Sequence, residues 1–124
     1  MTSAKRQAAE RRGRSGERRA MLLLLLKGYR ILGRRVRTPQ GEIDLVAKAP
    51  SGLVCFVEVK ARDDDDAAVQ SLGPRQRQRI ARAASLYLAA RPGLAPKGVR
   101  FDVVTVSRRF WPAHARDVWR GDGG

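Results

Sequence analysis

The spacing of apolar residues along the chain predicts two helices. Ser15 can cap the first, and the leucine-rich run 21–26 spreads apolar side chains around much of its circumference, so this helix is expected to be largely buried. Gly28 is a stop signal for it. Pro74 opens a second helix that runs to about Ala90, with apolar positions three and four residues apart on one face.

Four strands are predicted by short apolar runs between turn residues. Their expected ranges are 31–36, 42–48, 53–62 and 99–107, and no element is predicted after residue 108. Short turns link the first three, which predicts an antiparallel meander, and the helical crossover before the fourth favours a parallel pairing. The expected fold is α/β, with a mixed sheet flanked by helices in the order α-β-β-β-α-β. A single domain is expected over 13–120, after a disordered basic arm at 1–12.

Charged residues interrupt two strands that are otherwise apolar on both faces. Side chains two residues apart in a strand point the same way, so Glu42 and Asp44 share one face, as do Glu58 and Lys60. A Glu-x-Lys tripeptide alone is usually the solvated face of a strand. In a covered central strand, however, a charge is costly unless it pairs or binds a metal. The pattern therefore predicts carboxylates and a lysine that converge at one end of the sheet.

Clustered carboxylates favour a hard divalent cation, and Mg²⁺ or Mn²⁺ suits oxygen ligands. Such an ion can polarise a phosphodiester and lower the pKa of its bound water. A lysine beside it can orient that water or stabilise the added charge on the phosphate. Phosphodiester hydrolysis is thus the chemistry that this residue pattern favours.

The segments GEIDLVA at 41–47 and FVEVKAR at 56–62 resemble the YraN family of uncharacterised bacterial proteins. Further matches follow in the same order across most of the chain, at 16–20, 28–32, 80–88 and 100–104. That family resembles the PD-(D/E)XK nucleases and, among them, the archaeal Holliday-junction resolvases. The resemblance implies a restriction-endonuclease-like core and a homodimer as in the resolvases, although no residue pattern specifies an interface.

Carried over to this chain, the resemblance implies that Asp44 and Glu58 are metal ligands and that Lys60 is the catalytic lysine. It also implies that Glu17, on the first helix, is a further catalytic carboxylate and metal ligand. Without the resemblance, Glu17 is an acidic residue that favours the helix dipole. Glu42 matches the family's GEIDL motif, and it either orients the site or has a structural role.

The chain departs from the family pattern at two positions that could alter how a phosphate is held. Arg35 stands where the family usually has Asn, and Gln76 stands where Lys is expected near the start of the second helix. Neither departure removes a metal ligand.

The charge balance favours a polyanionic partner. Lys and Arg number 26 against 12 Asp and Glu, which gives a formal net charge of +14 and a pI of about 11.5. Nucleic acid is the expected partner, and DNA by resemblance; an anionic membrane surface or a ribosome is the alternative. Arg75, Arg79 and Arg82 share one helix face, and together with Arg35 they are the candidate phosphate contacts. A solvated face explains the helical arginines equally well.

Single residues exclude other classes of site. One cysteine, Cys55, allows no internal disulfide and no zinc cluster, and one histidine, His114, allows no multi-histidine metal site. Cys55 is expected in the core, and His114 in a structural or surface position. The apolar run 21–26 is far shorter than the roughly 20 residues that cross a bilayer, and no signal-peptide cleavage site follows it. We therefore expect a cytoplasmic protein with no membrane partner.

Together these patterns predict a Mg²⁺- or Mn²⁺-dependent endonuclease that hydrolyses phosphodiester bonds, with branched or structured DNA as the substrate that the resemblance implies. The alternative is a non-catalytic module of the same fold that binds nucleic acid or the ribosome. The acidic run 63–66 is expected to solvate a loop, with a second metal site as the less favoured interpretation.

Overall fold

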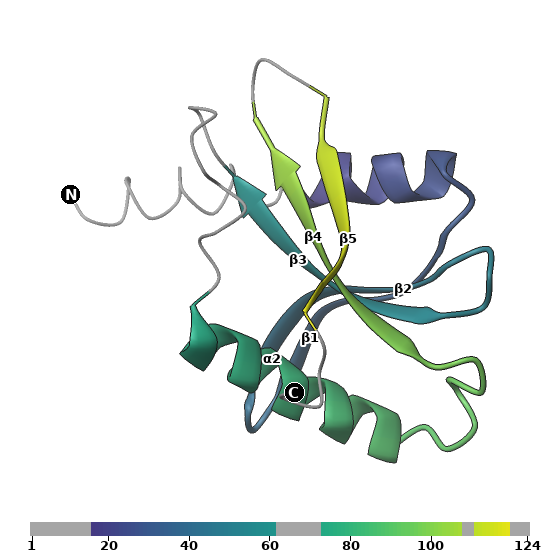
Figure 1. Cartoon of the computed structure of the whole chain (residues 1–124), viewed down its shortest axis with the longest axis vertical. Coiled ribbons are helices and arrows are strands. Elements are labelled where there is room, and N and C mark those ends of the chain that lie inside the picture. The colour runs from purple at the N-terminus through teal and green to yellow at the C-terminus, as the bar shows by residue number, and fades with distance from the viewer. Residues whose placement is uncertain (1–15, 62–72, 108–110, 120–124) are drawn as a thin grey trace.

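The computed structural model describes residues 16–61, 73–107 and 111–119. One mixed sheet has the strand order β1-β2-β3-β4-β5 (Figure 1). The first three strands pair antiparallel, β4 is parallel to β3, and β5 is antiparallel to β4. The strands are β1 (Arg30–Thr38), β2 (Gly41–Lys48), β3 (Val54–Ala61), β4 (Val99–Val106) and β5 (Ala113–Trp119).

Two helices accompany the sheet and lie on opposite faces of it. The N-terminal helix is described over residues 16–26, and α2 spans Pro74–Ala89 (Figure 1). Alternate residues of β3 separate the two cores: Val57 packs in a cluster with Leu24 of the N-terminal helix, whereas Phe56 packs with Ile80 of α2. Both faces of β3 are therefore covered, as its continuous apolar run requires.

The predicted order α-β-β-β-α-β is confirmed, and so is the parallel pairing after the helical crossover. The fifth strand was not predicted. Its sequence, AHARDVW, lacks the apolar alternation of a half-buried strand, and its Asp117 has a positive φ of 55°. An edge strand of this kind is defined by its pairing with β4, which local pattern does not reveal. The expected basic arm at 1–12 and the acidic run 63–66 lie outside the described residues.

The N-terminal helix is less buried than its leucine content suggested. Leu24 is fully buried, but Leu22, Leu25 and Leu26 are 50%, 53% and 68% exposed. Only one stripe of the helix faces the sheet, so the expectation of burial around much of its circumference is wrong. Within the described ranges, neither helix combines the length and apolar content needed to cross a membrane.

Candidate functional site

Asp44 lies where β2 and β3 separate. The two strands pair from Leu45↔Val57 to Lys48↔Val54, so Asp44 stands just past the end of the ladder. Its Oδ2 accepts a hydrogen bond from the Val59 N–H at 2.8 Å. The carboxylate thereby replaces a strand partner for that N–H, and the bond holds one of its oxygens in a defined place.

Glu58 meets Asp44 at this separation point. Burial raises the pKa of Glu58 to about 9, helped by the negative charge of Asp44 and by a hydrogen bond between the two carboxyl groups. The charge of Lys60 acts in the opposite direction, and that of Glu42 adds to the increase. Two negative charges so close together require a cation or a proton. In the metal-free protein Glu58 therefore holds a proton at neutral pH.

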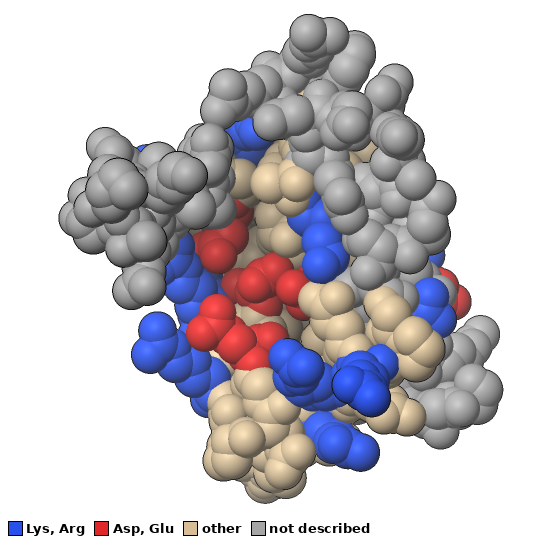
Figure 2. Space-filling view, turned by 90° about the vertical axis from the view of Figure 1, so that its left-hand side faces the viewer, with Lys and Arg blue, Asp and Glu red and all other residues tan. Residues whose placement is uncertain are grey.

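Acidic and basic side chains lie together on one face of the molecule. Figure 2 shows acidic side chains gathered in a hollow on one side of the molecule, with basic side chains around it. Glu42 is exposed, and its Oε2 accepts a hydrogen bond from Arg37 Nε at 3.3 Å. Lys60, two residues after Glu58, is half-buried in β3.

Glu17 is engaged elsewhere. Its Oε1 accepts a hydrogen bond from Arg35 Nε at 2.9 Å, and both residues line a pocket of about 160 Å³. The pairs Arg34↔Leu45 and Val36↔Ile43 place Arg35 across from Asp44 in the ladder between β1 and β2. Among the residues that the structure describes, no three His, Cys, Asp or Glu side chains are arranged to hold a metal ion. The ligand role of Glu17 therefore stays a prediction.

The backbone at Arg35 suits the Asn of the family pattern better than the Arg that this chain has. Arg35 has a φ of 49°, in the left-handed region. That conformation costs an ordinary residue roughly 1–2 kcal/mol, whereas Asn adopts it more readily. The Asn that the family resemblance led us to expect would fit this backbone, and Arg35 instead contributes an ion pair to Glu17.

The arginines of α2 lie beside the turn that leads into β2. Arg75, Arg79 and Arg82 are exposed, on the side of the helix away from the buried Ile80 and Ala83. The stem of Arg79 covers Gly41, because a Cβ at Gly41 would be 2.6 Å from Arg79 Cγ. Arg82 lines an open pocket with Gln40, Ser85 and Leu86. The basic helix face is thus adjacent to the start of the strand that carries Asp44.

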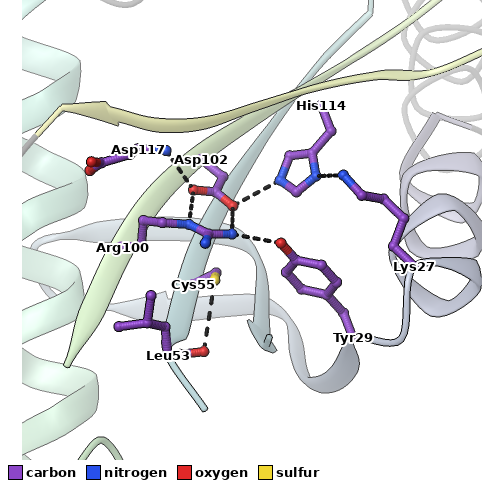
Figure 3. Close-up of polar contacts among 8 residues, drawn as sticks. All are labelled: Lys27, Tyr29, Leu53, Cys55, Arg100, Asp102, His114 and Asp117. Carbon is purple, nitrogen blue, oxygen red and sulfur yellow. Dashed lines mark hydrogen bonds and ion pairs between the residues drawn. The ribbon is translucent and has the colours of Figure 1, made fainter. Parts of the chain in front are cut away.

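A second polar cluster was not predicted from the sequence. Asp102 of β4 is fully buried, and the side chains of Arg100 and His114 both contact its carboxylate (Figure 3). His114 was expected to be structural or at the surface; its side chain is 2% exposed. Arg100 and Asp102 alternate in a largely apolar strand, VRFDVVTV, which is the signal that marked Asp44 and could have marked this pair.

Hydrogen bonds keep Asp102 ionised in spite of its burial. Burial acts to raise its pKa, but the bonds from His114, from Arg100 and from the Asp117 N–H outweigh it and lower the pKa to about 2. Arg100 donates from Nε and from one terminal nitrogen, each at 2.9 Å, and the Asp117 N–H lies at 3.0 Å. The carboxylate is therefore a permanent buried anion at neutral pH.

Comparison with known proteins identifies the family. The model of a family described as "Uncharacterised protein family UPF0102" matches residues 16–106. A UPF0102 protein of Parvibaculum lavamentivorans is 50% identical over 113 residues, which cover 91% of this chain and 84% of that one. A UPF0102 protein of Maricaulis maris is 52% identical over 119 residues, which cover 96% of this chain and 92% of that one.

Among solved structures, that of Pyrococcus furiosus SfsA in complex with Ca²⁺ is similar at 17% identity, over 78% of this chain and 58% of that one. Its TM-score of 0.32 is too low to support any argument about this protein. The family model and the relatives, in contrast, cover nearly the whole described part of the chain, including both strands of the carboxyl pair. The chain therefore belongs to UPF0102, the YraN family that its motifs indicated.

Proposed function

We propose that this protein is a divalent-metal-dependent endonuclease that hydrolyses phosphodiester bonds in nucleic acid. The observation that carries the proposal is the meeting of Asp44 and Glu58 where two buried strands separate. The Val59 N–H holds Asp44 there, and burial together with the charge and hydrogen bond of Asp44 raises the pKa of Glu58. A structural role gives two neighbouring carboxyls no reason to meet in a half-buried position, because each raises the energy of the other's charged form. A divalent cation between them removes that cost.

The donor set suits Mg²⁺ or Mn²⁺. Mg²⁺ is commonly held by one or two carboxylates and keeps several waters, so Asp44 and Glu58 would suffice without a third protein ligand. The proton that burial and Asp44 keep on Glu58 is the one that a cation would displace. When bound, the ion would polarise the scissile phosphate and lower the pKa of a coordinated water.

The protein's own groups would have separate tasks. The Val59 N–H would hold Asp44 in position through its bond to Oδ2. Lys60, which shares a strand face with Glu58, would donate to the attacking water or to a phosphate oxygen, where charge increases in the transition state. Glu17 would join the site only after leaving Arg35, and Arg35 would then be free to contact a phosphate.

The arginine face of α2 would hold the backbone of the substrate. Arg75, Arg79 and Arg82 are exposed beside the β1–β2 turn, and a net charge of +14 favours a polyanion over the whole surface. By resemblance to the resolvases, we propose DNA as the partner, branched or structured DNA as the substrate, and a homodimer as the working form.

Cleavage of a panel of nucleic acids tests the proposal. Purified protein is incubated with four-way junction, flap, single-stranded and duplex DNA, and with matched RNA, in Mg²⁺, Mn²⁺ or EDTA. We expect metal-dependent cleavage of at least one substrate, and a loss of about 100-fold or more in Lys60→Ala because one transition-state donor is removed. Lys97→Ala, which changes an exposed lysine in the loop before β4, is the matched control and should cleave normally.

Two results would contradict the proposal. The first is the absence of cleavage on every substrate by a folded protein. The second is cleavage that survives Lys60→Ala unchanged, which would indicate a contaminating nuclease. Binding without cleavage would favour the non-catalytic nucleic-acid-binding module instead.

A further inference from the structure

The second polar cluster contains an amine, a base and a carboxylate in series. Lys27 Nζ lies 2.6 Å from His114 Nδ1, and His114 Nε2 lies 2.8 Å from Asp102 Oδ2 (Figure 3). Lys27 directly follows the N-terminal helix, while His114 and Asp102 come from the neighbouring strands β5 and β4. A nucleophile within hydrogen-bond reach of a base that a third group orients is the arrangement of activated nucleophiles. The proposed nuclease site uses none of these groups.

The base is held rigidly. Asp102 is ionised and is itself fixed by Arg100 and by the Asp117 N–H. An ionised carboxylate can only accept hydrogen bonds, so the proton of the imidazole is on His114 Nε2, which donates it to Asp102. His114 Nδ1 therefore presents its lone pair to Lys27. The imidazole is also packed edge-on against the ring of Tyr29, with 5.6 Å between ring centroids. Its orientation toward the amine is therefore set before any reagent arrives.

The nucleophile, in contrast, is accessible. Lys27 is exposed, whereas the His114 side chain is 2% exposed beneath it. Partial burial and the positive charge of Arg116 lower the pKa of Lys27, while the charge of Asp102 acts to raise it. Arg116 is exposed on β5, and its charge acts on Lys27, so it would attract an anionic reagent to this amine.

We propose that Lys27 is an acylation site: its amine accepts an acyl group from an anionic acyl donor such as an acyl phosphate, with His114 as the base and Asp102 as its orienting group. The site is independent of the proposed nuclease activity. Acylation would remove the positive charge of Lys27, which follows the N-terminal helix and contacts His114 of β5.

With an acyl phosphate as the donor, the acyl group moves to Lys27 and phosphate leaves. One proton of the Lys27 ammonium moves to His114 Nδ1, and the imidazolium so formed is stabilised by Asp102. The neutral amine attacks the acyl carbon, a C–N bond forms, and the C–O bond to phosphate breaks with its electron pair leaving on phosphate. A second N–H proton goes to the departing phosphate, and His114 returns its proton to water. The products are the amide, hydrogen phosphate and one proton.

Acetylation by acetyl phosphate, followed by peptide mass spectrometry, tests the site in the full chain. Lys97, an exposed lysine, is the internal control within each molecule. We expect Lys27 to be acetylated at least about tenfold faster than Lys97, since a positioned base contributes this much or more. In His114→Gln the two rates should become similar.

A second measurement uses only the parent protein, so that the test does not depend on whether His114→Gln folds. In urea at a concentration that unfolds the parent protein, the Lys27 to Lys97 ratio should fall to about one because the relay is gone. Equal rates in the folded parent would overturn the proposal. A Lys27 preference that persists in urea, or in a folded His114→Gln, would overturn it as well, because the preference would not depend on the base.

Discussion

Replacing Glu58 by glutamine is expected to abolish metal-dependent cleavage while it stabilises the metal-free protein. Glutamine keeps the size of the side chain but removes the carboxylate that would hold the cation, so cleavage should fall by about 100-fold or more. The same change removes a carboxyl group whose ionised form is opposed by burial and by Asp44. The free energy of unfolding in EDTA at pH 8 should therefore rise by roughly 1–3 kcal/mol.

The pH dependence of this gain has a definite sign. The folded-state pKa of Glu58 is raised from 4.5 to about 9, so its contribution to stability is fully present below pH 4.5 and is lost as the pH rises toward 9. Glutamine does not titrate, and the difference between variant and parent should grow across this window. Urea unfolding at pH 5 and pH 8 measures it. Glu42→Gln, at an exposed position, is the control and should change stability by less than about 0.5 kcal/mol.

A Glu58→Gln variant that is less stable than the parent at pH 8 in EDTA would contradict this account. That result would mean that the Glu58 carboxylate is stabilised by partners within the protein and needs no cation.

Replacing Asp102 by asparagine is expected to cause the largest loss of stability. Asp102 is fully buried, and the side chain of its partner Arg100 is only 14% exposed. Removing one partner leaves an uncompensated buried charge, which costs roughly 3–5 kcal/mol. In the parent protein the depressed pKa of about 2 places the loss of this stabilisation between about pH 4 and pH 2. The stabilisation by ionised Asp102 is fully present at neutral pH.

Urea unfolding at pH 7 measures the effect. Arg37→Gln is the matched control, because it breaks an ion pair with Glu42 whose side chains are 86% and 46% exposed. Exposed pairs of this kind contribute at most about 1 kcal/mol. If Asp102→Asn were as stable as Arg37→Gln, the buried network would not be the anchor between β4 and β5 that its hydrogen bonds indicate.

The sheet and the carboxyl pair could be predicted because both depend on local periodicity. Apolar runs with turn residues between them gave the first four strands within about two residues. The two-residue period placed Asp44 and Glu58 on faces that meet once β2 and β3 pair. Separation of the strands beyond Leu45↔Val57 was not predictable, because it depends on Asp44 bonding to the Val59 backbone fifteen residues away.

Contacts that are distant in sequence escaped prediction. Lys27, Asp102 and His114 come from three separate elements, and only the pairing of β4 with β5 brings the last two together. The resemblance implied that Glu17 faces the metal site, and its pairing with Arg35, eighteen residues away, was not predicted. The fifth strand was not predicted for the same reason, because its pairing with β4 and not its own sequence pattern defines it.

Calorimetric titration of the parent protein and of Asp44→Asn with Mn²⁺ tests most directly whether Asp44 and Glu58 form a metal site. We expect one binding event in the parent, with proton release at pH 7 as the cation displaces the proton from Glu58. Binding should be weakened about 10-fold or more in the variant. Equal affinity of Mn²⁺ for the two proteins, or no binding to a folded parent, would contradict the proposed metal site.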